Sequence, residues 1–414
     1  MQVTFCQYDA EHYAGGPNTR LRRLLPRLKL RGIEPRVLFL TVTGSGPTVR
    51  ALERAGIECR VTPWITWTED RIRWILEALR ESPPDVFVPH VVTAACYAAR
   101  WVSAAGIPTV GAMNSDGPLN WALFDEFVAG LPEYRVWGLA CVSELLELEA
   151  RRRAPAEVDV CRIPGGVPLP GRSASPPGEV LRLVYAGRLV EEGKRARDVA
   201  RALCRAVGEV PGVEAVLYGE GPDQPEIERI LERDGQGGVR LGGLVDNDRI
   251  QEEMLRAHVF VQLSEYEGLS NALCEAMACG LVPVCLEIRS GTRELVSHGE
   301  TGLLVEDRGD AFVGAIRRLR NDPQLWQRIS QAAREKVARD YTLDAAAGGW
   351  VTFLERLAAR AGSPDAIRIP RTIRLPPLRP GLACDDTRRP WLVKRGARWL
   401  WHRARALRAG GCDS

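Results

Sequence analysis

Short apolar runs alternate with helical stretches along most of this sequence, and that alternation limits the folds it can adopt. In the first half, strands are predicted at Val3–Gln7, Arg36–Leu40, Asp85–Pro89, Pro108–Ala112 and Val136–Val142, with helices at Asn18–Leu30, Thr68–Glu81 and Thr93–Ala105. In the second half, strands are predicted at Leu181–Tyr185, Ala215–Tyr218, Val239–Leu241, Val259–Leu263 and Val282–Leu286. This alternation produces parallel sheets covered by helices on both faces, so we predict an α/β protein with two doubly wound, Rossmann-like domains.

The length of 414 residues is too great for a single hydrophobic core. A stretch rich in Pro, Gly and Ser at 164–178 is predicted to link a first domain at 1–163 to a second domain at 179–340. A helix is expected at 341–361, and whether it crosses back to the first domain stays open. Residues 362–414 are expected to form a Pro- and Arg-rich extension. Parallel sheets bind ligands beyond the carboxyl ends of their strands, so the site is expected in a cleft between the domains.

The composition excludes several classes of protein. With 45% hydrophobic and 26% charged residues the chain is globular, and a net charge of +3 is too small to indicate nucleic-acid binding. The 11 cysteines show no metal-binding or disulfide spacing, which favours a reducing compartment. The sequence begins directly with a predicted strand, and no apolar run approaches the ~18 residues of a membrane span. We therefore expect a cytoplasmic protein and leave open a peripheral position on the inner face of the cell membrane.

The strongest local signal is the stretch from Glu267 to Pro283, which reads as a loop, a helix start and the turn into the next strand. Ser270 or Asn271 can cap that helix, which places Glu275 in its first turns. The free backbone amides at the helix start suit a diphosphate, and two carboxylates beside them can accept hydrogen bonds from sugar hydroxyls. The alternative is a capped helix whose acid is merely favoured by the helix dipole.

A second signal follows the strand predicted at Leu181–Tyr185, where a glycine turn precedes Arg188 and Lys194 opens the next helix. An arginine can bind a diphosphate through two parallel hydrogen bonds, and a lysine supplies a point charge. Lys194 is one of four lysines in a sequence that otherwise uses arginine, which argues against a chance lysine here. The alternative interpretation is a solvated, charged turn.

Together these segments resemble family 4 glycosyltransferases, whose hallmark is a glutamate, seven residues and a second glutamate, here Glu267 and Glu275. Further segments agree in order and spacing: Gly15-Gly16, Asp85–His90, Cys141–Glu144, Ile163–Val167, Tyr218–Pro222, Leu241–Gly243 and Glu294–Gly302. The resemblance extends roughly from Met1 to Leu357. It implies the GT-B fold, in which two Rossmann-like domains face each other across a cleft.

The resemblance also implies roles at matching positions. Arg188 and Lys194 would hold the diphosphate of the sugar donor, Glu275 would bind the ribose hydroxyls, and Glu267 would bind the transferred sugar. His90 would approach the reacting centre from the first domain. Contacts to the phosphates, the sugar and the base are implied for the glycine-containing segments, namely Gly15, Gly16, Gly242, Gly268, Leu269, Ser270 and Asn271.

By this resemblance, the reaction is transfer of a sugar from a nucleotide-diphosphate donor to a hydroxyl group, with retention at the anomeric carbon. Arg188 and Lys194 would stabilise the charge that develops on the leaving diphosphate without a metal ion. No D-x-D pair is placed where a divalent ion would bridge the phosphates, and Asp385-Asp386 lies in the tail. Neither a metal site nor a cofactor is therefore expected.

The chain departs from the family at one position. Many relatives carry a histidine in the first domain where this chain has Asn114, which argues against a histidine-assisted mechanism. Asp116 could replace it as a catalytic polar contact, or merely cap a turn. If the acceptor's proton passes to the departing phosphate, no dedicated base is needed.

Two other functions share this architecture. A nucleotide-sugar epimerase would surround the sugar with acids and histidines, whereas the chain has only five histidines, mostly outside these motifs. A non-catalytic, nucleotide-sugar-binding partner of another transferase would be consistent with Asn114. The sequence does not distinguish a UDP from a GDP sugar, nor a glycan from a lipid-linked acceptor, and it does not give the oligomeric state.

The tail carries a last signal. Residues 387–411 contain eight Arg or Lys and no acid, and apolar residues including Leu400 and Trp401 recur on one face of a helix. A basic amphipathic helix with tryptophan is typical of binding to an anionic membrane surface. The alternative is docking on the protein itself or on a partner.

Overall fold

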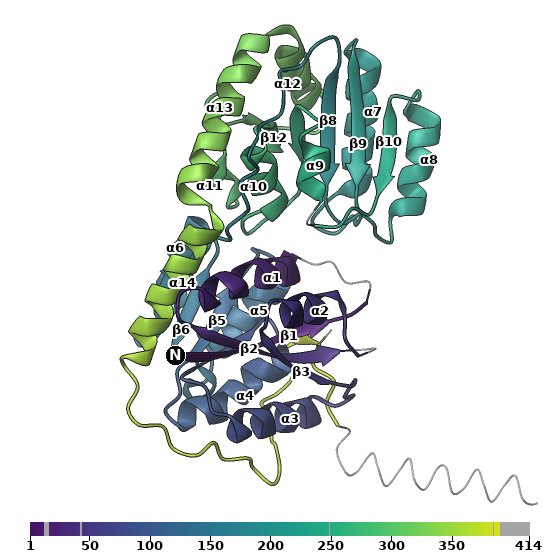
Figure 1. The fold of residues 1–414 in the computed structure, drawn as a ribbon. Helices are drawn as coiled ribbons and strands as arrows, with labels where there is room; N and C mark the ends of the chain where they lie inside the picture. Colours follow the sequence, from purple (N-terminus) through teal and green to yellow (C-terminus); the bar gives the residue numbers. More distant parts are fainter. Residues whose placement is uncertain (12–15, 42–43, 248, 384, 390–414) are drawn as a thin grey trace, which may run out of the picture.

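The computed structural model describes residues 1–11, 16–41, 44–247, 249–383 and 385–389. Within them, the chain forms two α/β domains, drawn one above the other in Figure 1, and each is built on a parallel sheet. The predicted pair of doubly wound sheets is confirmed.

The described part of the first domain contains seven parallel strands in the order β3-β2-β1-β4-β5-β6-β7. The strands are β1 (Gln2–Asp9), β2 (Glu34–Thr41), β3 (Glu58–Thr62), β4 (Val86–His90), β5 (Thr109–Met113), β6 (Gly138–Cys141) and β7 (Asp159–Arg162). The helices are α1 (Gly16–Lys29), α2 (Pro47–Arg54), α3 (Thr68–Glu81), α4 (Thr93–Ala104), α5 (Pro118–Phe127), the short 3-10 helix η1 (Pro132–Tyr134) and α6 (Glu144–Arg153). The strand order reverses between β1 and β4, which is where such sheets bind ligands.

The described part of the second domain contains six parallel strands in the order β10-β9-β8-β11-β12-β13. The strands are β8 (Leu181–Ala186), β9 (Val213–Tyr218), β10 (Val239–Gly243), β11 (Val259–Gln262), β12 (Val282–Leu286) and β13 (Leu303–Val305). The helices are α7 (Ala196–Glu209), α8 (Gln224–Asp234), α9 (Ile250–Met254), α10 (Asn271–Ala278), α11 (Thr292–Leu295), α12 (Asp310–Asn321) and α13 (Pro323–Asp340). Here the order reverses between β8 and β11, so the loops after these two strands form the corresponding ligand-binding position.

Helices cover both faces of the first sheet, which explains why its strands are almost continuously apolar. In β2, Val37 and Phe39 join the core beneath α1 and α2, whereas Leu38 and Leu40 join the core beneath α3 and α4. All four side chains are at most 3% exposed. Figure 1 shows α1 and α2 above this sheet and α3 and α4 below it.

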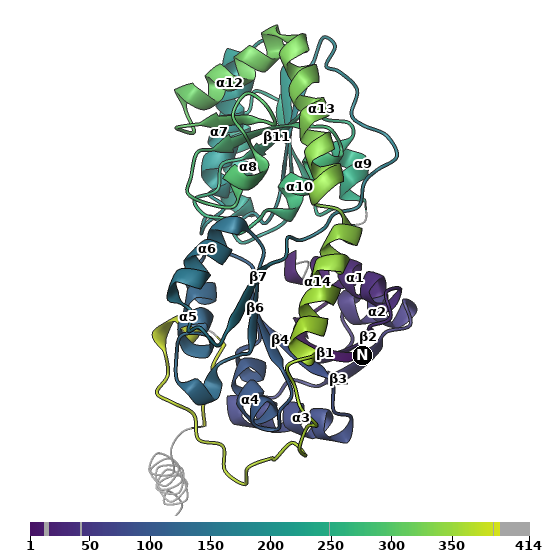
Figure 2. The same cartoon turned by 90° about the vertical axis from the view of Figure 1, so that its left-hand side faces the viewer.

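The chain crosses between the domains twice, and the two crossings are bonded to each other. Between β7 and β8, the backbone N–H of Val167 donates to the carbonyl of Tyr341 at 3.0 Å, and Val167 forms an isolated parallel bridge with Thr342. The helix that follows, α14 (Leu343–Ala358), then runs beside α1 of the first domain (Figure 2). Its Trp350 packs edge-on against Phe5 of β1, with ring centroids 6.4 Å apart.

Glu294 of α11 connects the second domain to this crossing. Its carboxylate accepts hydrogen bonds from Arg162 Nε at 2.9 Å, from the Tyr341 hydroxyl at 3.0 Å and from the backbone N–H of Glu144 at 2.6 Å. The partners belong to β7, to the connection between α13 and α14, and to the start of α6. One carboxylate therefore joins the second domain to both crossings.

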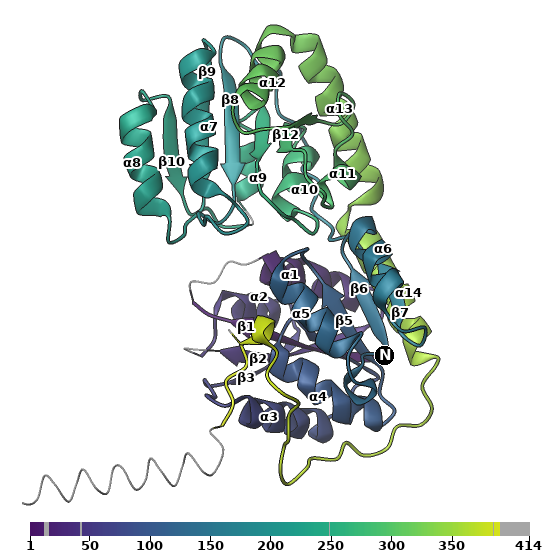
Figure 3. The same ribbon diagram turned by 180° about the vertical axis from the view of Figure 1, so that it is seen from behind.

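The extension after α14 wraps around the first domain (Figure 3) and ends in the short 3-10 helix η2 (Pro380–Leu382) and the residues that follow it. Ile367 and Leu382 are buried in the core beneath α3 and α4. The Asp385 carboxylate accepts hydrogen bonds from the Tyr8 hydroxyl at 2.6 Å and from the backbone N–H of Thr93 at 3.0 Å. Asp385 therefore lies at the carboxyl end of β1 and at the N-terminus of α4.

The next residues of the extension lie against α3. The guanidinium of Arg71, which is 2% exposed, donates to the carbonyl of Ile65 at 2.7 Å and to the Asp385 carbonyl at 3.3 Å. The backbone N–H of Thr68, the first residue of α3, donates to the Thr387 carbonyl at 2.8 Å. Of the helix predicted over 387–411, residues 387–389 are not helical and the remainder lies outside the described residues. No helix in the described part of the chain is long and apolar enough to cross a membrane.

Candidate functional site at the domain interface

The start of α10 is built as the sequence predicts. The Ser270 hydroxyl accepts a hydrogen bond from the backbone N–H of Leu273 at 3.3 Å, which is N-capping of the helix. Gly268, in the loop before it, packs directly on the first domain, because a Cβ at that position would lie 2.3 Å from the carbonyl oxygen of Asn114. Only glycine allows this approach. Leu269 is 5% exposed and belongs to the core beneath the loop.

Lys194 and Glu267 meet at the carboxyl ends of β8 and β11. The Lys194 ammonium donates to Glu267 Oε1 at 2.5 Å, and the two side chains are 26% and 10% exposed. Arg195 caps α7 in the left-handed conformation, with φ of 53°. The structure thus brings together the cation and one of the two carboxylates that the sequence predicts for the sugar-donor site.

Arg188 lies beside this pair and is exposed. Its backbone is held by the Tyr185 hydroxyl, which donates to the Arg188 carbonyl at 2.9 Å. Burial and the charge of Glu267 raise the pKa of Tyr185, and the charge of Arg188 lowers it, so both charged groups lie near this ring. The ring of Tyr266 is close to both as well. The loop after β8 therefore carries two cations, Arg188 and Lys194, close to the carboxylate of Glu267.

One face of α1 lies against the second domain. Glu275 of α10 is ion-paired with Arg23 of α1, and Arg23 Nη2 also donates to the carbonyl of Asn247 at 2.9 Å. The Asn247 side chain in turn donates to the Thr19 hydroxyl at 2.7 Å. A Cβ on Gly16 would lie 3.7 Å from the Asn271 side-chain nitrogen. Gly15 precedes the described part of α1 and falls outside the described residues.

The loop after β5 contributes the second contact region. Asn114 Oδ1 accepts a hydrogen bond from Arg20 Nη1, and the Asn114 backbone N–H donates to the Asn120 side chain at 3.0 Å. A Cβ on Gly117 would lie 3.0 Å from the ring of Tyr266, so this loop also touches the loop that contains Glu267. The loops after β5 and β11 are therefore in direct contact across the interface.

His90, the predicted first-domain contact, lies beneath Arg20. It is 5% exposed, adopts the left-handed conformation with φ of 53°, and its Nδ1 is 3.1 Å from Gln7 Nε2, which donates to it. Burial and the nearby charge of Arg20 lower the pKa of His90 to about 3, so the ring is neutral near pH 7. Together with Arg20, Asn114, Phe5 and Trp350 it lines a small cavity beside α1.

Asp116 has a local partner in this structure. Its Oδ1 accepts a hydrogen bond from Trp121 Nε1 at 2.7 Å, which ties the loop after β5 to α5. This contact corresponds to the turn-stabilising alternative that the sequence left open. The contact does not test a catalytic role for Asp116.

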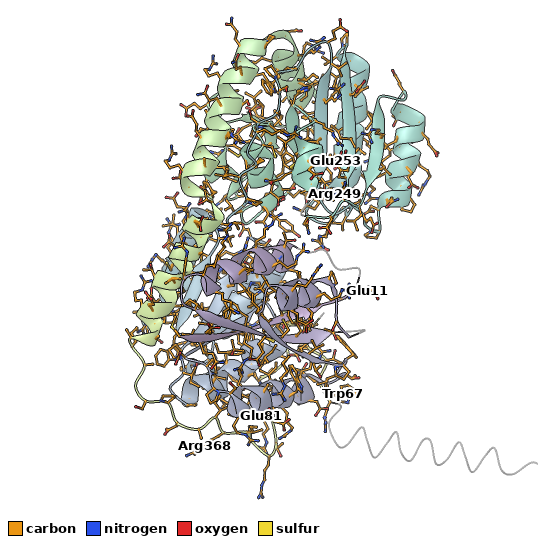
Figure 4. The ribbon with its side chains drawn as sticks, in the orientation of Figure 1. Glu11, Trp67, Glu81, Arg249, Glu253 and Arg368 are labelled. Atoms are coloured by element: carbon orange, nitrogen blue, oxygen red, sulfur yellow. The ribbon has the colours of Figure 1, made fainter. Side chains whose placement is uncertain are left out.

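The segment predicted to pass beside the base lies at the end of β10. A Cβ on Gly242 would lie 2.2 Å from the Tyr218 ring, and the Tyr218 hydroxyl donates to Glu253 Oε2 at 2.9 Å. Figure 4 shows Glu253 and Arg249 on the side of the second domain that faces the first, and Glu11 on the first domain below them.

No group of three or more metal-ligating side chains occurs within the described residues.

Sequence reasoning did not identify three residues of this interface: Arg20, Arg23 and Tyr266. The two arginines are spaced three apart on α1 and lie one residue before Leu21 and Leu24 of its apolar face, which is a signal that could have been used. Their partners Asn271 and Glu275, however, are 251 and 252 residues away, and no local pattern predicts such pairs.

The fold is shared with solved structures. The crystal structure of Anabaena HepE in complex with UDP and glucose superimposes with a TM-score of 0.69 at 17% identity, and the match covers 86% of this chain and 100% of that chain. An identity this low shows the fold alone. The fold is that of the GT-B class of glycosyltransferases.

Within that class, residues 181–322 match the family model for "Glycosyl transferases group 1". An exopolysaccharide phosphotransferase of Streptomyces coelicolor is 28% identical over 185 residues, which are 44% of this chain and 19% of that protein. The lipopolysaccharide core biosynthesis glycosyltransferase LpsD of Rhizobium meliloti is 24% identical over 342 residues, which are 75% of this chain and 94% of LpsD. The chain thus spans about a fifth of the first relative and nearly all of the second.

Proposed function

We propose that the chain is a retaining, metal-independent glycosyltransferase that moves a sugar from a nucleotide-diphosphate donor to a hydroxyl acceptor. One arrangement carries the proposal. The Lys194–Glu267 pair, the exposed Arg188 and the capped start of α10 lie together where the second sheet reverses its strand order, opposite α1 of the first domain.

In this proposal Lys194 and Arg188 bind the diphosphate and stabilise the charge that grows as the anomeric C–O bond breaks. Glu275 accepts hydrogen bonds from the ribose, and Glu267 orients the sugar while Lys194 holds its carboxylate in place. The backbone amides of Gly268–Asn271 contact phosphate and sugar. The acceptor hydroxyl attacks from the leaving-group side, and its proton passes to the departing phosphate oxygen. A buried, neutral His90 is consistent with a mechanism that has no dedicated base.

The similarity to LpsD and to HepE, whose crystal structure contains UDP and glucose, supports a UDP sugar as the first donor to test and a glycan or a lipid-linked saccharide as the acceptor. We also propose that the protein works in the cytoplasm, where nucleotide sugars are the available donors. The basic tail would bring it to the inner face of the membrane.

The test is incubation of the purified chain with UDP and GDP sugars and candidate acceptors, after a thermal-shift screen has identified the donor that raises the melting temperature. Formation of a glycosylated acceptor with the donor's anomeric configuration supports the proposal. An isomerised donor would instead indicate an epimerase. Donor binding without any turnover would indicate a non-catalytic binding partner, which is the alternative consistent with Asn114.

A further inference from the structure

Arg20 of α1 lies between the two domains, and among the described residues its side chain is hydrogen-bonded only to amides. Its Nη1 donates to Asn114 Oδ1 in the loop after β5, and its Nη2 donates to Asn271 Oδ1 at the start of α10, at 3.4 Å. Its Nε is buried and has no hydrogen-bond partner. Arg20 therefore bridges the domains while one of its N–H groups remains unsatisfied.

The charge of Arg20 is also uncompensated. Among the described residues no carboxylate forms an ion pair with it, although Arg23, one turn further along α1, is paired with Glu275. Burial lowers the pKa of Arg20 to about 10, and the only group that raises it is the thiol of Cys274. Removing a cation from water is costly unless an anion or several good acceptors replace the water. The amide oxygens of Asn114 and Asn271 replace only part of the water that Arg20 loses on burial.

Asn114 provides a second unsatisfied donor at the same place. An arginine has only N–H donors, so the Asn114 oxygen must face Arg20 and its NH2 group must face away. That Nδ2 is buried and has no partner. Two unsatisfied donors, one of them on a cation, therefore belong to two residues that are hydrogen-bonded to each other.

This cluster adjoins both segments proposed to contact the sugar donor. A Cβ on Gly165 would lie 2.9 Å from Arg20 Nε, and one on Gly268 would lie 2.3 Å from the backbone carbonyl oxygen of Asn114, so glycine backbone packs closely against both residues. Asn271 itself belongs to the start of α10. Arg20 therefore adjoins the start of α10, which is proposed to contact phosphate and sugar.

We propose that Arg20, together with Asn114 and Asn271, forms an oxyanion site that binds the sugar donor from the first domain. The proposal rests on the proposed function and extends it, because Arg188 and Lys194 supply cations from the second domain only. Two donor groups share the required chemistry: a phosphate of the nucleoside diphosphate, and the carboxylate of an acidic sugar. Either would satisfy the N–H groups and the charge of Arg20, and would join the two domains through the ligand.

The first test compares the unmodified chain with Arg20→Gln and, as a matched control on the same helix, Arg27→Gln, whose side chain is 43% exposed beside Asp344. Calorimetry would measure binding of UDP, GDP, UDP-glucose and UDP-glucuronate. Loss of a charge-assisted hydrogen bond predicts a decrease in affinity of about 10- to 100-fold for Arg20→Gln, with Arg27→Gln unchanged. A loss for every ligand identifies the phosphate, and a loss confined to UDP-glucuronate identifies the sugar carboxylate.

A second variant covers the case in which Arg20→Gln fails to fold. Asn114→Asp places a carboxylate against Arg20, so it should supply the missing counter-charge, maintain or raise the melting temperature and weaken anion binding as Arg20→Gln does. Unchanged affinities for all four ligands in either folded variant would overturn the oxyanion site while leaving the proposed function intact. If the unmodified chain binds none of the ligands and transfers no sugar, the proposed function fails, and the oxyanion site fails with it.

Discussion

Arg23 of the first domain and Glu275 of the second form an ion pair whose side chains are only 10% and 6% exposed. Glu275 is the residue proposed to bind the ribose, so a bound nucleotide and Arg23 would share one carboxylate. Breaking a buried pair by removing one partner leaves the other charge uncompensated. The effect of a Glu275 variant on donor use must therefore be compared with the effect of an Arg23 variant.

Glu275→Ala should impair use of the sugar donor, because the ribose loses a buried hydrogen-bond acceptor worth about 1–3 kcal/mol of binding free energy. Arg23→Ala is the matched control, since it removes the same ion pair but keeps the carboxylate. Initial rates over a range of donor concentrations measure the effect. Near-normal turnover of Glu275→Ala at low donor concentration would remove Glu275 from the site.

Lys194→Ala should lower kcat more than donor affinity, because the charge on the diphosphate grows in the transition state. By analogy with removal of one donor from an oxyanion hole, the loss in kcat is about 10²- to 10³-fold. Lys29→Ala is the control, because Lys29 lies at the exposed end of α1 and donates only to the Gly56 carbonyl. An effect on KM alone would contradict the proposed role.

Activity should be unchanged in excess EDTA. Arg188 and Lys194 are proposed to neutralise the leaving diphosphate, so the transition state needs no divalent ion. Transfer rates with and without the chelator test this directly. A complete loss of activity that magnesium or manganese restores would overturn the metal-independent mechanism.

The stability of the protein should fall in mild acid, partly through His90. The pKa of this ring is about 3 in the native state, against 6.5 for an ordinary histidine, so between these pH values the unfolded chain binds a proton that the native chain does not. Above about pH 6.5, His90 makes its full contribution to the free energy of unfolding. That contribution decreases as the pH falls towards 3, and at pH 5 it is about 2 kcal/mol smaller than at neutral pH.

His90→Gln keeps a partner for Gln7 and should remove this part of the pH dependence. Urea unfolding at about pH 7 and about pH 5 gives the comparison, with His298→Gln as an exposed control. The same loss of stability in His90→Gln as in the unmodified chain would show that His90 is protonated in the native state.

Removal of residues 390–414 should leave binding of the sugar donor intact and reduce transfer to a lipid-linked acceptor. The cut belongs after Arg389, because the Thr387 carbonyl accepts a hydrogen bond from α3 and Arg389 is ion-paired with Asp70. Attraction to anionic vesicles should amount to about 1 kcal/mol per basic residue near the surface and should decrease with salt.

Co-sedimentation of the full and shortened chains with anionic vesicles measures this attraction. If both remain in the supernatant at low salt, the tail does not bind membranes. Aggregation of the shortened chain would indicate instead that the apolar face of the tail packs on the protein.

The sequence predicted the sheets better than it predicted their edges. Thr68–Glu81 was predicted as a helix and is one, and the buried strands were located to within a few residues because they are continuously apolar. β3 (Glu58–Thr62) and β7 (Asp159–Arg162) were not separately predicted, since they are short edge strands containing charged residues, and β13 has only three residues.

For the site, local motifs located the start of α10 and singled out Lys194 and Glu267 separately, because glycine turns and helix caps are local signals; the ion pair between these two residues was not predicted. The contacts of Arg20 and Asp385 follow from the packing of elements hundreds of residues apart, which no short pattern records. Asp385 shows this most clearly. From the sequence it was considered only as part of a metal-binding pair, and that role was rejected. In the structure its carboxylate accepts hydrogen bonds from the first backbone N–H of α4 and from the Tyr8 hydroxyl.

The paired crossings restrict how the two domains can move relative to each other. Val167 and Thr342 lie side by side, and Glu294 is hydrogen-bonded to the residues around them. The two segments therefore form a hinge, and any rotation of one domain against the other would take place about an axis through it. Rotation about that axis displaces each part of a domain in proportion to its distance from it. Figure 1 shows α8, β10 and α2 on the side away from α14, so such a rotation would displace these elements the most.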